Sequence, residues 1–299
     1  MATLITVVGP TAIGKTTLSI KLANHFDAPI ISCDSRQFYT EMTIGTAVPN
    51  AEELAAAPHH FIQNRSISED YNVGQFEKDA LELLSELFKE NAVVIMVGGS
   101  GLYVDAVLKG LDHFPDVDEK IRTQLTADLD QFGIEHLQKQ LQELDPISYN
   151  TIAIENPQRL IRALEISIGT NIPFSTFKNK PKTPRSFHSI KVGINADRVI
   201  IYDRINKRVD RMMSEGLLDE VKGLLPYKNL NALQTVGYRE LFLYLENKST
   251  LEEAVQEIKK NTRRFAKRQL TWFKKDPEIL WFDHLTKFKA IIKEIETKF

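Results

Sequence analysis

The sequence predicts an α/β protein in which a parallel sheet is flanked by helices and interrupted by an all-helical insertion. Runs rich in β-branched residues alternate with helical patterns in the N-terminal third, which is typical of a parallel sheet covered by helices. A later stretch has helical periodicity without a strand candidate, and this predicts the insertion. The expected strands are Leu4–Val8, Pro29–Cys33, Val93–Val97, Ile190–Asn195 and Ile279–Phe282.

The first strand leads into Gly9–Thr16, which fits the P-loop pattern G-x-x-x-x-G-K-[ST], and a helical pattern at Leu18–Phe26 follows. In this setting backbone N–H groups and a helix N-terminus face a phosphate chain. We therefore expect a P-loop NTPase-like core in which Lys15 reaches the outer phosphates and Thr16 holds Mg²⁺. The flanking strand and helix argue against a chance glycine turn. The motif alone leaves open which phosphate compound binds and whether a phosphoryl group moves.

The other helices define two regions. Apolar spacing predicts a helix at Phe76–Glu90 before the insertion. We expect the core to comprise residues 1–114 and 186–299, and the helical insertion residues 115–185, with the proline-containing segment Asn179–Arg185 as its linker. Further helices are expected at Val199–Glu215, Leu217–Leu225, Val236–Leu245 and Leu251–Lys274.

Composition narrows the class of partner and compartment. The 299 residues include 38 Lys and Arg against 40 Asp and Glu, a net charge of −2, so a nucleic acid would need a local basic patch. The single cysteine, Cys33, excludes an internal disulfide and a multi-cysteine zinc site, and its apolar surroundings predict a core position. We find no signal peptide and no run long enough to span a bilayer, which predicts a cytoplasmic protein.

Asp34 opens the segment Asp34–Tyr39 just after the second strand. Ligands of open α/β sheets bind at the carboxyl ends of strands, so Asp34 lies near the P-loop if the first two strands are neighbours. It is a candidate general base or Mg²⁺ partner; a helix-capping or turn role is the alternative.

The segment Gly98–Tyr103 follows the third strand, where an ATPase often has an acidic residue. Its glycines weaken a plain ATPase interpretation and allow close approach of a ligand, unless they form an ordinary turn.

Two cationic stretches come later. Thr262–Lys275 combines six cations with three aromatic residues, a mixture that suits RNA phosphates and unpaired bases. A solvated basic helix with Trp272 in the core is the alternative. Arg204 and Arg208 are four residues apart and could face a diphosphate, or could form surface ion pairs with nearby acids. The pair His59-His60 lacks the spacing of a helical zinc site, and we expect no metal ligands there.

Taken together, these stretches resemble the tRNA dimethylallyltransferase family, also called tRNA isopentenyltransferases. A P-loop alone is weak evidence, but an ordered set over nearly the whole chain is specific. The matching segments are Gly9–Thr16, Asp34–Tyr39, Ile44–Ala47, Pro58–His60, Gly98–Tyr103, Pro157–Arg159, Arg204–Met212, Gly237–Glu240 and Lys267–Trp272.

The resemblance implies that a dimethylallyl group passes from dimethylallyl diphosphate to N6 of the adenosine 3′ to a tRNA anticodon, with release of diphosphate and use of Mg²⁺. It implies a monomer whose helical insertion contacts the anticodon stem-loop. Asp34, Lys15 and Thr16 would be catalytic, and the donor would be held by Gly9, Pro10, Thr11, Ala12, Ile13, Gly14, Lys15, Thr16, Arg204 and Arg208. The implied tRNA contacts are Asp34, Ser35, Arg36, Gln37, Ser100, Arg122, Gln158, Arg159, Leu160, Ile161, Arg162, Gln234, Gly237, Tyr238, Arg239, Lys267, Arg268, Gln269, Trp272 and Lys274.

Two positions depart from the family pattern: Ile13 stands where many relatives have Ser, and Ser100 where Thr is usual.

Three other hypotheses about the function remain at this point. The chain could prenylate free adenine nucleotides, which the basic segment Arg263–Lys275 argues against. It could be a small-molecule kinase, which the missing acidic residue after Val93–Val97 argues against. It could be a non-catalytic RNA-binding module, which the intact P-loop argues against.

Overall fold

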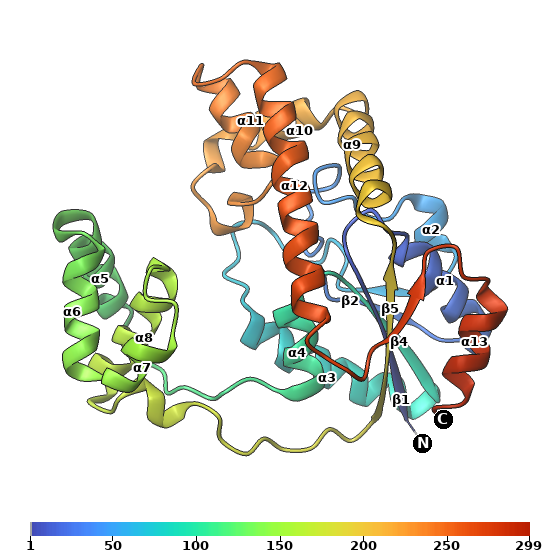
Figure 1. Cartoon of the computed structure of the whole chain (residues 1–299), viewed down its shortest axis with the longest axis horizontal. Coiled ribbons are helices and arrows are strands. Elements are labelled where there is room, and N and C mark those ends of the chain that lie inside the picture. The colour runs from blue at the N-terminus through green and yellow to red at the C-terminus, as the bar shows by residue number, and fades with distance from the viewer. Residues whose placement is uncertain (1) are drawn as a thin grey trace. The chain divides into compact units, whose positions relative to one another are not determined.

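The computed structural model describes residues 2–299, and its centre is a six-stranded sheet in the order β3-β2-β4-β1-β5-β6 (Figure 1). All neighbouring strands are parallel, which confirms the predicted α/β class with helices on the flanks. The strands are β1 (Thr3–Val8), β2 (Ile30–Ser32), β3 (His59–His60), β4 (Val93–Val97), β5 (His188–Asn195) and β6 (Leu280–Asp283).

The sheet differs from the expectation in two respects. Strand β3 was not predicted, because His59 and His60 are only two residues and show no periodicity. The first two strands are not neighbours either, because β4 lies between β2 and β1. Their carboxyl ends still lie at the same edge, since parallel strands all end on one side of the sheet.

Both faces of the sheet are covered, which explains why its strands are apolar throughout. In β1, Ile5 and Val7 pack into one cluster with residues of α1 and α13, whereas Leu4 and Val8 pack into another with residues of α3 and α4. Figure 1 shows these helix pairs on opposite sides of the strands. The helices flanking this part of the sheet are α1 (Lys15–Phe26), α2 (Ala51–Ala55), α3 (Val73–Glu90), α4 (Gly101–Lys109) and α13 (Phe288–Glu296).

A third apolar cluster lies among the helices that follow β5. It includes Met42, Val209, Tyr238 and Ile258, so it joins the segment after β2 to three of these helices. Figure 1 shows the longest of them, α12, running beside α9 toward α4. The elements of this region are α9 (Arg198–Ser214), α10 (Leu217–Gly223), η2 (Leu225–Tyr227), η3 (Asn231–Leu233), α11 (Tyr238–Leu245) and α12 (Leu251–Phe273).

The chain divides into two compact units, one of residues 1–109 and 184–299 and one of residues 110–183, where the sequence analysis placed the insertion at 115–185. The second unit has its own core, which includes Leu125, Leu141 and Leu164. Pro146 and Pro157 each stand in the first turn of a helix, where the missing N–H costs nothing. Its elements are α5 (Glu119–Phe132), α6 (Ile134–Leu144), α7 (Pro146–Thr151), α8 (Pro157–Thr170) and η1 (Phe174–Phe177).

Within residues 2–299, no helix has both the length and the apolar character needed to cross a membrane.

The aromatic cluster around Phe76 supports the segment that carries Asp34. Phe76 is fully buried and lies 5.2 Å, between ring centres, from Phe38, with Phe61 and Tyr103 also in contact. We predict that Phe76→Ala lowers the free energy of unfolding by about 3–5 kcal/mol, because it leaves a cavity in a packed core. Chemical denaturation measures this. The control is Phe299→Ala, where the side chain is 57% exposed and the loss should stay below about 1 kcal/mol. Equal losses in the two variants would contradict the prediction.

Candidate active site

The P-loop connects the carboxyl end of β1 to the N-terminus of α1. Gly9 has φ 144° and Gly14 has φ 106°, values that L side chains rarely adopt. A β-carbon at Gly9 would also lie 2.5 Å from the carbonyl oxygen of Ile194 in the adjacent strand β5. The glycines of the motif are therefore required by the backbone path and by close strand packing.

Lys15 lies over this loop. Its Nζ donates hydrogen bonds to the carbonyl oxygens of Gly9 at 3.1 Å and Pro10 at 2.9 Å, and it lies beside Gly99. The residue as a whole is partly exposed, but its ammonium group is enclosed, and this burial lowers the pKa of Lys15 to about 8. The positive charge of Arg208 lowers this pKa further, while Asp34 opposes the shift. An anion bound at the loop would stabilise the charged form.

Two arginines from α9 complete the cationic wall. The Nη1 of Arg204 donates to the carbonyl oxygen of Ile13 at 3.0 Å, and the Nη1 of Arg208 donates to Oγ1 of Thr11 at 3.1 Å. The nearby acids are engaged elsewhere: Asp203 pairs with Lys207, and Asp210 pairs with Lys259. The surface ion-pair alternative for the two arginines is therefore wrong. Burial lowers the pKa of Arg208, which again indicates a site prepared for an anion.

Asp34 lines the same cavity as Lys15 and Thr16, a space of about 520 Å³. Its Oδ1 accepts a hydrogen bond from the N–H of Arg36 at 3.2 Å, so the turn role is real. Its Oδ2 accepts no hydrogen bond from residues 2–299, and this oxygen is left for a ligand. The residue thus lies near the P-loop as expected, although β2 and β1 are not neighbours.

The turn after β4 lies against the segment that carries Asp34. The Oγ of Ser100 is 3.2 Å from both the N–H and the Oγ of Ser35. A β-carbon at Gly98 would lie 2.5 Å from Sγ of Cys33, so this glycine lets the ends of β4 and β2 approach closely. Cys33 itself is fully buried, as the sequence indicated.

A second cavity of about 360 Å³ shares Thr11, Asp34 and Arg208 with the first. Part of its wall is apolar and comes from α9, α10 and α12. Several residues expected to contact tRNA also line it, namely Ser35, Arg36, Ser100, Gln234, Gly237, Arg239 and Arg268. Asp34 therefore lies between a cationic, phosphate-sized space and a mixed space ringed by arginines.

Glu220, which the sequence analysis missed, fixes the wall between these cavities. Its carboxylate accepts hydrogen bonds from the N–H groups of Thr43, Ile44 and Gly45, and from the hydroxyl of Tyr238 at 2.7 Å. A β-carbon at Gly45 would lie 2.6 Å from the Tyr238 ring, so the loop passes directly over that ring. In the sequence, Glu220 looks like any polar residue on the outer face of a helix.

Several predicted tRNA contacts are not available to a ligand. Tyr238 is fully buried under the loop of residues 43–47. Gln269 is 5% exposed and binds the P-loop and Gly99 instead. Leu160 and Ile161 are buried in the core of the helical unit. We therefore correct these four assignments: burial within the protein, not contact with RNA, explains these side chains.

Gln37 holds protein backbone, because its Nε2 donates to the carbonyl oxygens of Thr46 and Ala47, although it also lines the first cavity. Along α12, Lys267 and Lys274 are exposed, and Trp272 is 39% exposed rather than a core residue. That exposure contradicts the alternative in which Trp272 is core.

In the helical unit, the remaining predicted contacts are grouped around one acid. Glu165 has a side chain only 4% exposed, and both Arg122 and Arg162 pair with it. Arg122 also donates to Oε1 of Gln158 at 3.0 Å. Arg159 is exposed at the start of the same helix as Gln158 and Arg162. One buried carboxylate thus holds two exposed guanidinium groups, so this group of three side chains carries one excess positive charge.

Comparisons with known proteins agree on one family. A family model described as IPP transferase matches residues 37–276. The tRNA dimethylallyltransferase of Christiangramia forsetii is 59% identical over 99% of this chain and 98% of its own length, and that of Flavobacterium johnsoniae is 58% identical over 99% and 97%. The structure of a tRNA isopentenylpyrophosphate transferase from Bacillus halodurans matches with a TM-score of 0.73 at 38% identity, covering 99% of this chain and 95% of that one. The structure of a eukaryotic dimethylallyltransferase acting on tRNA matches with a TM-score of 0.80 at 25% identity, covering 100% of this chain and 76% of that one.

The lowered pKa of Lys15 predicts a pH dependence for anion binding. Above pH 8 the free site loses its charged ammonium group, so the affinity for inorganic diphosphate should fall by about tenfold between pH 7 and pH 9. Calorimetric titration at several pH values measures this. Because diphosphate itself titrates, the control is Lys15→Arg, which keeps a positive charge throughout. The wild-type profile should be steeper than that of the variant; parallel profiles would refute a titrating Lys15.

Proposed function

The chain belongs to the IPP transferase family, and from this premise we propose that it transfers a dimethylallyl group from dimethylallyl diphosphate to N6 of the adenosine 3′ to the anticodon of a tRNA, releasing diphosphate. The observation that carries the proposal is the position of Asp34 between two connected cavities. One has the cations of a diphosphate site, and the other has the size and arginines that suit a nucleotide.

The donor is proposed to place its diphosphate on the P-loop. As the allylic C–O bond breaks, negative charge grows on the departing diphosphate and positive charge spreads over the allyl carbons. Lys15, Arg204 and Arg208 all approach the loop that would hold the diphosphate, so they are placed where the negative charge grows. Preorganised cations and N–H groups stabilise such a transition state without reorganising.

We propose that the site uses Mg²⁺. The donor set suits this ion, because Thr16 lines the cavity with a hydroxyl oxygen and the rest of the coordination shell would come from diphosphate oxygens and water. Residues 2–299 contain no cluster of three His, Cys, Asp or Glu side chains that would hold a metal without substrate. When bound, Mg²⁺ would neutralise part of the leaving group's charge.

Asp34 is proposed as the general base. The lone pair of adenine N6 is delocalised into the ring, so the amine becomes an effective nucleophile only as it loses a proton. Asp34 lines both cavities, and its Oδ2 is left free because Oδ1 takes the hydrogen bond of the Arg36 turn. It can therefore accept the N6 proton while the new C–N bond forms.

The target base must leave its stack to reach Asp34, because N6 inside a stacked loop is not accessible to a carboxylate that lines a cavity. We propose that it enters through the second cavity, which Arg36, Arg239, Arg268 and Phe265 line. The exposed cations Lys267 and Lys274 of α12 and the group around Glu165 would meet RNA phosphates. A monomeric state and a cytoplasmic setting stay predictions from the sequence.

The direct test is transfer from labelled dimethylallyl diphosphate to an anticodon stem-loop RNA in the presence of Mg²⁺. We predict incorporation at the adenosine 3′ to the anticodon, and none when that adenosine is replaced by guanosine. Two further arms use AMP as acceptor and ATP as donor. Transfer to AMP but not to RNA, or phosphoryl transfer from ATP, would replace the proposal with one of the alternatives.

The role of Asp34 has its own test. We predict that Asp34→Asn lowers the single-turnover transfer rate by about a hundredfold to ten-thousandfold, because an amide cannot accept the N6 proton, while affinity for the stem-loop RNA is largely kept. The matched control is Asp27→Asn, the same substitution at an exposed residue that ends α1. If the Asp34 variant turns over at the rate of the control, Asp34 is not the base.

A further inference from the structure

One buried amide joins the P-loop to the basic helix α12. The Oε1 of Gln269 accepts a hydrogen bond from the N–H of Thr11 at 2.8 Å, and its Nε2 donates to the carbonyl oxygen of Gly99 at 3.0 Å. Both ends of the side chain are therefore occupied by protein backbone. A β-carbon at Gly99 would lie 2.1 Å from Nε2 of Gln269, so this glycine is what admits the amide.

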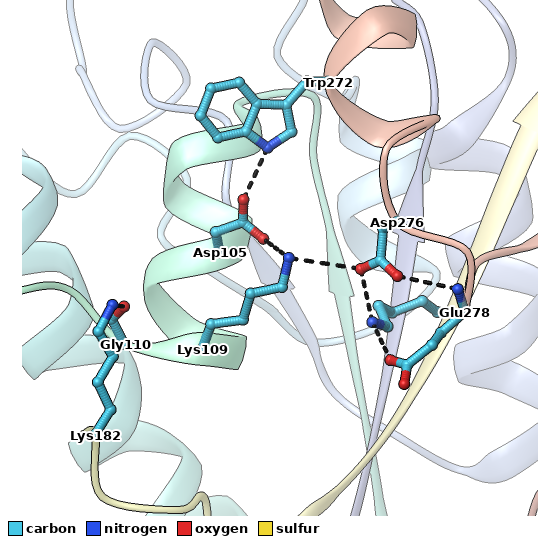
Figure 2. A network of polar contacts seen from close by, with 8 residues as sticks. Asp105, Lys109, Gly110, Lys182, Trp272, Asp276 and Glu278 are labelled. Atoms are coloured by element: carbon cyan, nitrogen blue, oxygen red, sulfur yellow. Dashed lines mark hydrogen bonds and ion pairs between the residues drawn. The ribbon is translucent and has the colours of Figure 1, made fainter. Parts of the chain in front are cut away.

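The position of Gln269 is fixed by its helix. Ala266 and Phe273, one turn before and after, are buried in the clusters on the two faces of the sheet. Trp272, three residues after Gln269, adds a further contact. Its Nε1 donates to Asp105 at 2.8 Å, and Asp105 pairs with Lys109. Figure 2 shows that this network continues from Lys109 to Asp276. The C-terminal end of α12 is thus anchored to α4 and to the segment after α12, and the amide cannot easily move away from the loop.

This contact changes what the P-loop can bind. Such a loop cradles the inner phosphates with its backbone N–H groups, while its lysine reaches the outer ones. An N–H early in the loop is farther from the helix N-terminus, on the side toward which a longer phosphate chain would extend. Pro10 has no N–H, and the N–H of Thr11 is used by Gln269. From Ala12 to Thr16, by contrast, no backbone N–H donates to an acceptor within residues 2–299. The donors that remain lie on the helix side of the loop.

We propose that Gln269 is a positioning residue that restricts the P-loop to a diphosphate, by withdrawing the donor that a third phosphate would need. This inference rests on the proposed function, since the leaving group there is a diphosphate. It gives a physical reason why nucleoside triphosphates, which share the same P-loop chemistry, would not compete strongly for the donor site. The residue responsible for the preference for diphosphate over triphosphate would then belong to α12, the helix whose outer face carries Lys267 and Arg268.

The test compares the affinities of inorganic diphosphate and inorganic triphosphate at one fixed Mg²⁺ concentration, by calorimetric titration of the full chain. The wild-type protein should bind triphosphate no more tightly than diphosphate, despite its greater charge. In Gln269→Ala, the freed N–H of Thr11 should shift the ratio of dissociation constants toward triphosphate by about tenfold, the effect of one hydrogen bond to a charged group.

Gly99→Ala provides a second, independent variant, because its methyl group would push the amide away without removing it. It should shift the ratio in the same direction, and it decides the matter if Gln269→Ala does not fold. The matched control is Asn261→Ala, which truncates a part-buried amide of the same helix that binds Glu240 instead. Its ratio should equal that of the wild type, even if its melting temperature falls.

An unchanged ratio in both Gln269→Ala and Gly99→Ala would overturn the inference, as would a wild-type protein that prefers triphosphate tenfold. The result is separate from that of the transfer assay. Transfer to RNA with an unchanged ratio would reject only the role of Gln269. A shifted ratio without transfer to any RNA would reject the proposed function and leave the selectivity of the loop standing.

Discussion

The structure depends on holding three cations against one loop without a carboxylate partner. Lys15, Arg204 and Arg208 form no ion pair with any acid in residues 2–299; instead they bond to carbonyl and hydroxyl oxygens of the loop. Burial of such charges is unfavourable, and the lowered pKa values of Lys15 and Arg208 express that cost. A bound diphosphate would pair with these charges and remove the cost of their burial. The removal of this cost would then contribute to the free energy of diphosphate binding. This constraint explains why β1, β5, α1 and α9 must meet at one point.

The same arrangement explains how a P-loop can serve carbon transfer. In a kinase the cations stabilise a phosphoryl group that is transferred. Here they would stabilise the diphosphate leaving group, which remains bound to the loop while the dimethylallyl group is transferred toward the acceptor beside Asp34. The reaction then requires that the acceptor approach from the side opposite the loop. The second cavity shares Asp34 with the first, touches the loop only at Thr11, and is bounded by α9, α10 and α12. Glu220 keeps the dividing loop in place through three successive N–H groups, much as a bound anion would.

What the sequence predicted, and what it missed, follows from how local each signal is. The P-loop and its flanks were predicted because strand, glycine turn and helix are adjacent in the chain. The short strand β3 and the insertion of β4 between β1 and β2 depend on pairing across many residues, and periodicity carries no information about that. Asp34 lies near the P-loop although β2 and β1 are not neighbours, because the carboxyl ends of all strands in a parallel sheet lie at the same edge. Glu220 and the inward orientation of Gln269 and Tyr238 were missed because only the packing of distant helices determines them.

Helix α12 shows why that last distinction matters for function. Its sequence is a mixture of cations and aromatics, and from composition alone all of them are candidates for contact with RNA. The spacing of the buried residues Ala266, Gln269 and Phe273 shows that one face of the helix belongs to the core, while Lys267, Arg268 and Lys274 project from the other. A buried glutamine between two apolar neighbours needs partners for its amide, because an unpaired polar group there would be costly. Its partners are the backbone of the P-loop and of the turn after β4, so the surface proposed to meet RNA and the site proposed to hold the diphosphate are connected by one side chain.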